Sequence, residues 1–239
     1  MIDISTCLNQ SSIKRDVRLP RLASLALDTS HPWFLHYRSL FADLQKTVPF
    51  ARGRMLDIGC GNKPFEGMFK GCVNPHFGCD VVQSSESRAD VICTATELPF
   101  KDESYATVIV TQVIEHVGDH ETMLREAFRV LQDNGVLILS GPMYWPLHEE
   151  PYDFFRFTEH GFRFLLEKAG FRIIQITNNG GKWATCGQVI IHTIANTRLS
   201  RGFVIRGINL VFAYLDDRYS TRDNPMNYVV VGRKVAQTV

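Results

Sequence analysis

The sequence predicts an α/β fold built on a doubly wound, mostly parallel sheet. Runs rich in β-branched residues alternate with segments of helical periodicity, and the first of these runs ends in a glycine turn. The chain has 239 residues, of which 45% are hydrophobic, so it can bury a sizeable core. We expect a single domain over residues 31–239, after a flexible segment at residues 1–30.

The first predicted helix covers residues 31–44, where apolar residues recur at helical spacing. We expect it to cover the ligand side of the sheet. An aromatic stripe on such a helix can touch substrate but usually packs into a core. We expect core packing for Trp33, Phe34, Tyr37 and Phe41.

The first predicted strand, residues 54–58, leads into a turn that contains Gly59 and Gly61. Glycine lets the backbone adopt dihedral angles that other residues avoid and lets a ligand approach closely. Dinucleotide-binding loops carry a third glycine where this chain has Pro64, which we expect in the first turn of the next helix. Proline offers no N–H to a phosphate, so the pattern favours a nucleoside without a pyrophosphate.

Asp80 lies near the end of the second predicted strand, residues 76–82, roughly twenty residues after the turn. A carboxylate at this position can accept hydrogen bonds from both ribose hydroxyls. Together, Asp57 and Asp80 could hold the amino group and the ribose of a nucleoside such as S-adenosylmethionine.

The later elements continue the alternation. Asp119 is the expected N-cap of a helix over residues 119–131, with Asn134 and Gly135 at its exit, and Thr158 caps a helix that ends at Gly170. Five further strands are expected at residues 89–93, 105–111, 136–140, 171–177 and 227–233.

Five segments in this order resemble the class I S-adenosylmethionine-dependent methyltransferases, in particular the type 11-like branch that acts on small molecules or sugars. They are residues 56–61, 97–105, 113–117, 124–131 and 134–137. The resemblance covers about residues 50 to 180 and implies a Rossmann-like, seven-stranded sheet whose last strand is antiparallel. Residues 31–180 would then form the core with the cofactor site, 181–226 a helical cap, and 227–239 the last strand and tail.

The resemblance also implies S-adenosylmethionine as cofactor and gives residue roles. The methionine part would lie beside Asp57, Gly59, Cys60 and Gly61, the ribose beside Asp80 and Val81, the adenine beside Thr94, Ala95 and Leu98, and the sulfonium beside Thr111 and Gln112. Two positions depart from the family pattern, because Thr94 and Ala106 stand where an acid is usual. A threonine hydroxyl can still accept a hydrogen bond from adenine.

The loop after the fifth strand, residues 141–158, is the candidate substrate site, because open α/β sheets bind ligands beyond the carboxyl ends of their strands. It combines aromatic rings, acids and a histidine, which suits a ring that carries hydroxyls. The substrate-binding candidates are Tyr144, Glu149, Glu150, Tyr152 and Arg156.

Methyl transfer from a sulfonium is an in-line displacement that needs alignment and the exclusion of water, and requires no metal. For a hydroxyl acceptor, His116 or His148 could remove the proton, assisted by Glu149 or Glu150. Each histidine could instead be a structural hydrogen-bonding group. An oxygen-rich metal site at His148, Glu149, Glu150 and Asp153 is conceivable, but adjacent loop residues rarely point at one centre, so we expect no metal.

Composition excludes several classes. A net charge of +1 argues against nucleic acid as a partner. Six cysteines are scattered without a C-x-x-C pair, which is typical of reduced core residues. The first five residues lack the start of a secretory signal and no apolar run reaches the ~20 residues of a spanning helix, so we expect a cytoplasmic protein.

Two apolar helical stretches, residues 189–195 and 203–215, follow with Arg198, Arg201 and Arg206 between or within them. Their apolar faces could pack on the domain, form a homodimer contact, or lie on a membrane beside a lipid-linked substrate.

The leading hypothesis is methyl transfer to a small-molecule or sugar acceptor, at a hydroxyl. The alternatives are a non-catalytic nucleoside-binding protein with the same fold and a nicotinamide-dependent oxidoreductase, which Pro64 disfavours.

Overall fold

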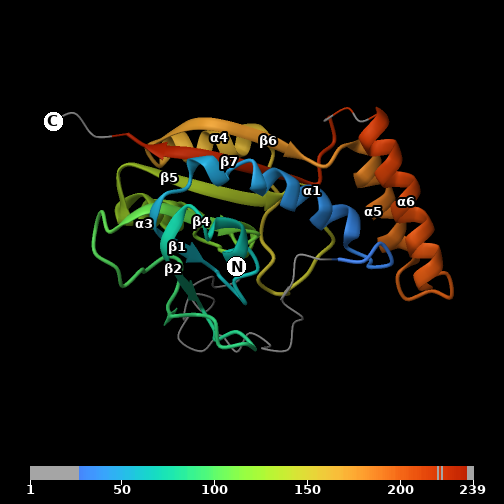
Figure 1. Ribbon diagram of the computed structural model, residues 1–239, viewed down its shortest axis with the longest axis horizontal. Coiled ribbons are helices and arrows are strands. Elements are labelled where there is room, and N and C mark those ends of the chain that lie inside the picture. Colours follow the sequence, from blue (N-terminus) through green and yellow to red (C-terminus); the bar gives the residue numbers. More distant parts are fainter. Residues whose placement is uncertain (1–26, 220, 222, 236–239) are drawn as a thin grey trace, which may run out of the picture.

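The computed structural model describes residues 27–219, 221 and 223–235. Its centre is a seven-stranded sheet in the order β3-β2-β1-β4-β5-β7-β6 (Figure 1). The strands are β1 Gly53–Ile58, β2 Val73–Asp80, β3 Val91–Ile92, β4 Tyr105–Thr111, β5 Leu131–Pro142, β6 Phe171–Asn179 and β7 Asn227–Lys234. Strands β1 to β5 pair in parallel, and β7 runs antiparallel to both of its neighbours. The predicted fold class is confirmed.

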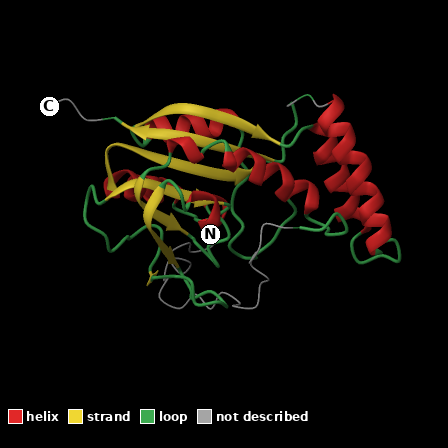
Figure 2. Ribbon diagram, viewed as in Figure 1, coloured by secondary structure: helices red, strands yellow, loops and turns green. Residues whose placement is uncertain are grey.

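Helices flank the sheet and extend beyond one end of it (Figure 2). They are α1 Phe34–Gln45, α2 Glu66–Phe69, α3 His120–Val130, α4 Glu159–Lys168, α5 Lys182–Ile194 and α6 Gly202–Tyr219, with short 3-10 turns η3 Val48–Phe50 and η4 Ile114–His116. The strand order reverses between β1 and β4, and open sheets bind ligands at the carboxyl ends of the strands beside such a reversal.

The sheet is apolar on both faces, as expected for parallel strands covered by helices on each side. Leu56 and Ile58 of β1 belong to the core beneath α3 and α4, whereas Met55 belongs to the core beneath α1. The period of two thus sends successive side chains to opposite cores. Tyr37 and Phe41 pack against the second core, which confirms their predicted packing.

Helix termini largely follow the predicted caps. The Asp119 carboxylate accepts a hydrogen bond from the backbone N–H of Thr122, and the Thr158 hydroxyl accepts one from the N–H of Gly161. Gly170 follows α4 with φ +93°, a left-handed conformation suited to glycine.

Two local expectations were wrong. Helix α2 has four residues and begins at Glu66, so Pro64 precedes the helix instead of lying in its first turn. Asn134 and Gly135 do not form the exit of helix α3. The helix ends at Val130 and β5 begins at the next residue, so Asn134, at φ +60°, lies within the strand.

The cysteines were also only partly as expected. Cys60 and Cys79 are buried, but Cys72 and Cys186 are exposed. The spacing of cysteines in the sequence does not predict whether each one is buried. Cys72 follows the short helix α2, and Cys186 lies on an exposed face of α5. Cys7 and most of the segment 1–30 lie outside the described residues.

Helices α5 and α6 pack on each other and on α1, beside the sheet end that carries the loop after β5 (Figure 1). Leu35, Ile191 and Ile205 lie in the core that joins them. Asn209 of α6 is fully buried, and its side-chain amide donates to the carbonyls of Thr29 and His31. The inner face of the tail therefore packs within the chain. Among the described residues, no helix combines the length and apolar character needed to cross a bilayer.

Candidate functional site

The turn after β1 has the backbone geometry that only glycine tolerates well. Gly59 has φ +71°, and a Cβ there would lie 2.4 Å from Cγ2 of Val113 in the loop after β4. Gly61 has φ +49°. The backbone N–H groups of Gly59 and Cys60 both donate to the carbonyl of Cys79, at 2.8 Å and 3.1 Å. The turn is thus packed against the ends of both neighbouring strands.

Asp80 closes the other side of this turn. It is 5% exposed, and its Oδ2 accepts a hydrogen bond from the N–H of Gly61 at 3.0 Å. Its Oδ1 accepts one from the N–H of Val81 at 2.8 Å. Asp80 lies nineteen positions after Gly61, yet the parallel pairing of β1 and β2 brings both to one edge of the sheet.

Asp57, which we expect to face a ligand together with Asp80, also contacts a side chain of β2. It is 1% exposed, and its Oδ2 lies 3.2 Å from Nε2 of His76. Burial raises the pKa of Asp57, and His76 acts in the opposite direction. Within the described part of the chain, Oδ1 of Asp57 is buried without a hydrogen-bond partner.

Lys63 is the basic residue of the turn, and its side chain reaches Asp90 and the backbone of β2. Its ammonium group contacts Oδ2 of Asp90 at 2.5 Å and the carbonyl of His76 at 3.2 Å. The Lys63 charge is therefore paired with Asp90.

The segment after β3 is held by helix α3. The N–H of Leu98 donates to Oε2 of Glu126 at 2.8 Å, and the guanidinium of Arg129 donates to the carbonyl of Leu98 at 2.9 Å. Thr94 and Ala95, half-buried, precede this anchor. Glu126 and Arg129 are not among the predicted site residues. The available signal was an acid and a base three positions apart on one helix.

The end of β4 is anchored to β5. Thr111 pairs with Ser140, and Gln112, at φ +53°, donates from its side-chain amide to the Ser140 hydroxyl at 3.1 Å. The predicted residues at this edge therefore have fixed positions beside the glycine turn, since β1 and β4 are adjacent strands.

Two predicted catalytic residues meet although they are far apart in sequence. The rings of His116, in η4, and His148, in the loop after β5, have centroids 4.6 Å apart. Glu115 lies beside them, with Oε1 3.9 Å from Nε2 of His116. Burial raises the pKa of Glu115 to about 8, against the nearby positive charge of Arg156. Glu115 belongs to the segment 113–117 that carries the family resemblance, and nothing in its local sequence predicts its burial.

Arg156 binds its own loop. Its guanidinium donates to Asp153 at 2.6 Å and 2.8 Å and to the carbonyls of Trp145 and Pro146. Burial works against an ionised Asp153, but the hydrogen bonds from Arg156 and from the N–H of His148, together with the charges of both residues, lower the pKa to about 2. The backbone N–H of His148 also donates to Asp153. This pair therefore shapes the loop that carries His148.

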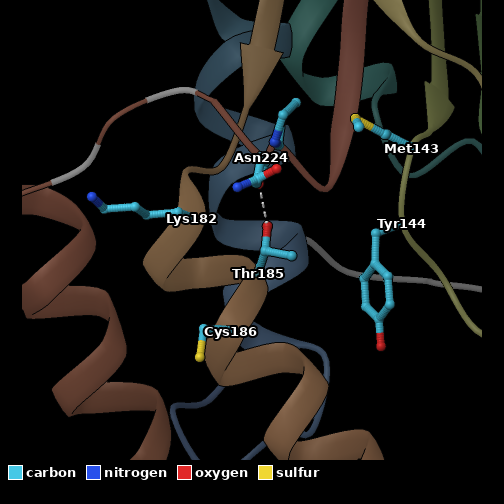
Figure 3. A pocket seen from close by; sticks show the side chains of 7 residues that line it. Met143, Tyr144, Lys182, Thr185, Cys186 and Asn224 are labelled. Atoms are coloured by element: carbon cyan, nitrogen blue, oxygen red, sulfur yellow. Dashed lines mark hydrogen bonds between the residues drawn. The ribbon is translucent and has the colours of Figure 1, made fainter.

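The other loop candidates are spread along it. Glu149, at φ +52°, and Glu150 lie beside His148, and the carbonyl of Tyr152 is bound to Nδ1 of His116. Tyr144 lines a pocket beside α5 (Figure 3). Thr185 there donates to the carbonyl of Asn224, and the full lining is Met143, Tyr144, Lys182, Thr185, Cys186, Asn224 and Pro225. None of the predicted cofactor residues lines this pocket.

Comparisons with known proteins agree with this geometry. A family model described as a methyltransferase domain matches residues 56–139. A probable S-adenosylmethionine-dependent methyltransferase from Mycobacterium tuberculosis is 30% identical over 125 residues, which are 48% of this chain and 44% of that protein. The chain spans about half the length of the curated relatives it matches.

Solved structures show the same fold. The [4+2]-cyclase SpnF has a TM-score of 0.59 at 16% identity, covering 87% of this chain and 84% of that one. An S-adenosylmethionine-dependent methyltransferase from Archaeoglobus fulgidus has a TM-score of 0.53 at 21% identity, covering 82% and 93%.

Proposed function

We propose that this chain is a class I S-adenosylmethionine-dependent methyltransferase and that it transfers a methyl group to a hydroxyl of a small-molecule or sugar acceptor. The site at the carboxyl ends of β1, β2 and β4 would take the cofactor. The loop after β5 would take the acceptor.

The residues at the glycine turn fit S-adenosylmethionine. A Cβ at Gly59 would collide with Val113, so the bare backbone of the turn is required where the methionine part would lie. Asp80 offers carboxylate oxygens at a position suited to ribose hydroxyls. Lys63 is already bound to Asp90, so the turn offers little to a pyrophosphate.

We assign the remaining roles from position. Thr94, Ala95 and Leu98 would lie along the adenine, and Thr111 and Gln112 would face the sulfonium. The bound cofactor supplies an electrophilic methyl group, and the chain's own residues align the acceptor and exclude water. His116 or His148 would accept the acceptor's proton at a ring nitrogen.

The acceptor contacts would come from Tyr144, Glu149, Glu150 and Tyr152. Arg156 has its hydrogen bonds inside the loop, which supports a positioning role for it. The departure at Ala106 lies at the start of β4, away from the carboxyl end that carries the glycine turn, so it does not weaken cofactor binding.

The hydrogen bond between Asp80 and Gly61 is the observation that carries the proposal. Calorimetric titration with S-adenosylmethionine tests it: Asp80→Ala should weaken binding at least tenfold, because a carboxylate that accepts ribose hydroxyls is lost. The exposed Asp133→Ala is the matched control and should bind normally. Unchanged affinity of Asp80→Ala, or preferential binding of a nicotinamide dinucleotide, would overturn the proposal.

Labelled methyl transfer to a panel of hydroxylated small molecules and sugars then separates turnover from mere binding. Tight cofactor binding without any transfer would favour a non-catalytic nucleoside-binding protein, a candidate raised by Thr94 at the adenine position.

A further inference from the structure

Three side chains with metal-ligand atoms converge beside the proposed acceptor site. One carboxylate oxygen of Glu115 and one ring nitrogen each of His116 and His148 all lie within 4.8 Å of one another. Two come from η4 after β4 and the third from the loop after β5, so only the tertiary structure unites them. This set shares only His148 with the loop residues His148, Glu149, Glu150 and Asp153, for which no metal is expected.

The Glu115 carboxylate is buried beside His116 and His148. Its residue is 1% exposed, and neither carboxylate oxygen has a hydrogen-bond partner among the described residues. Arg156, a nearby cation, donates instead to Asp153 and to loop carbonyls. A buried carboxyl group normally stays protonated, or forms a hydrogen bond, an ion pair or a metal bond, because desolvation of the ionised form costs several kcal/mol.

The two histidines have the tautomers that a metal site needs. Nδ1 of His116 lies 2.8 Å from the carbonyl oxygen of Tyr152, which can only accept, so Nδ1 carries the hydrogen and Nε2 carries the lone pair. Nδ1 of His148 lies 3.2 Å from the carbonyl of Pro146 and 3.2 Å from Oδ2 of Asp153. A metal-binding histidine typically donates its other N–H to such a carbonyl or carboxylate.

We propose that Glu115, His116 and His148 bind a divalent transition-metal ion such as Zn²⁺ or Mn²⁺. Two imidazoles and one carboxylate form a set that suits these ions better than Mg²⁺ or Ca²⁺. Ligand atoms about 2.1 Å from one ion lie about 3 to 3.5 Å apart, so the side chains must close in by about 1 Å.

Three protein ligands leave coordination positions open for a further oxygen. If methyl transfer to a hydroxyl occurs as proposed above, an acceptor oxygen bound there would be oriented and its proton made acidic enough to be lost to water. With the metal bound, the two histidines would act as ligands and not as the proton acceptor. This role rests on the proposed function, whereas metal binding itself does not.

Calorimetric titration of the chelator-treated full chain with ZnCl₂ and with MnCl₂ tests the site directly. We expect one ion per chain with at least one of the two metals. Glu115→Gln and His148→Ala should each weaken that affinity at least tenfold, because each removes a ligand. His160→Ala, which removes an exposed histidine of α4, is the matched control and should bind as the unsubstituted chain does.

Thermal unfolding with and without metal guards against misfolded variants. The metal should raise the Tm of the unsubstituted chain and of His160→Ala, and should leave the Tm of a folded Glu115→Gln chain unchanged. Absence of binding with both metals, or equal affinity in Glu115→Gln and the control, would overturn the proposal. A parallel titration with S-adenosylmethionine keeps the two proposals apart: cofactor binding without metal binding refutes only the metal site, and metal binding without cofactor binding refutes only the proposed activity.

Discussion

Gly59 is the most tightly constrained residue of the glycine turn after β1. Its φ is +71°, and an added Cβ would lie 2.4 Å from the side chain of Val113. Either feature disfavours a side chain, and both together fix the identity of the residue.

Gly59→Ala should therefore destabilise the chain by about 2 kcal/mol, through strain and overpacking. It should also weaken S-adenosylmethionine binding, because Val113 or the turn has to move. Urea unfolding and calorimetry measure the two effects. Gly67→Ala, where an added Cβ meets nothing within 4 Å, is the control, and equal behaviour of the two variants would contradict the assignment.

The ionisation of Glu126 should make the stability of the chain depend on pH. The hydrogen bond from Arg129 lowers the pKa of Glu126 below its ordinary value of 4.5, and the N–H of Leu98 adds to this effect. A lowered pKa in the folded state gives stability that is present above pH 4.5 and is lost as the pH falls through the folded-state pKa.

Glu126→Gln should cost about 1 to 2 kcal/mol near pH 7, since a charge-assisted hydrogen bond is weakened. The difference from the unsubstituted chain should shrink below pH 4, roughly, where the native carboxyl is also protonated. Denaturant unfolding at several pH values checks this. A constant difference across the range would show that ionisation plays no part, and the exposed Glu167→Gln should change little.

At the scale of elements, helix α3 begins at a side-chain cap and ends directly in β5. The cap matters to the site because α3 carries Glu126 and Arg129, which hold the segment beside the predicted adenine position. Asp119→Ala should cost about 1 kcal/mol by loss of the N-cap. Asp119→Asn should retain most of that stability, and a loss in Tm equal to that of the alanine variant would show that capping is not the cause.

The loop after β5 depends on one ion pair. Arg156 donates to the carbonyls of Trp145 and Pro146 near the start of the loop. Asp153 accepts from the backbone N–H of His148, whose ring lies beside His116. Arg156→Gln should leave S-adenosylmethionine affinity unchanged and raise the KM for the acceptor, because the loop loses its fixed shape while the glycine turn remains intact. Steady-state kinetics and calorimetry separate these quantities, and a matching fall in cofactor affinity would contradict the positioning role. Arg163→Gln, on an exposed face of α4, is the control.

At the scale of the whole molecule, α5 and α6 form an extension that is docked on α1 (Figure 1). Their inner face is buried, but Phe203, Leu210 and Tyr214 are exposed on the outer one. The homodimer and the contact with a membrane or lipid-linked substrate stay predictions for that outer face.

Asn209 is the polar anchor of this extension, because it is fully buried and donates to the carbonyls of Thr29 and His31. Asn209→Ala should destabilise the chain by about 1 to 3 kcal/mol, since those carbonyls lose their donor in a buried position. The exposed Arg206→Ala on the same helix should have little effect. Equal unfolding midpoints for the two variants would show that the extension is held without this anchor.

The sequence by itself determined the sheet strands, the helix caps at Asp119 and Thr158, the glycine turn and the position of Asp80. These features follow from local rules, because period, capping and turn residues act over a few positions. Only the tertiary structure decided that Asp57 faces His76, that Arg156 binds its own loop, and that Glu115 lies buried between two histidines. Those contacts join residues from different strands and loops, and a side chain's partner and burial depend on packing that no local pattern encodes.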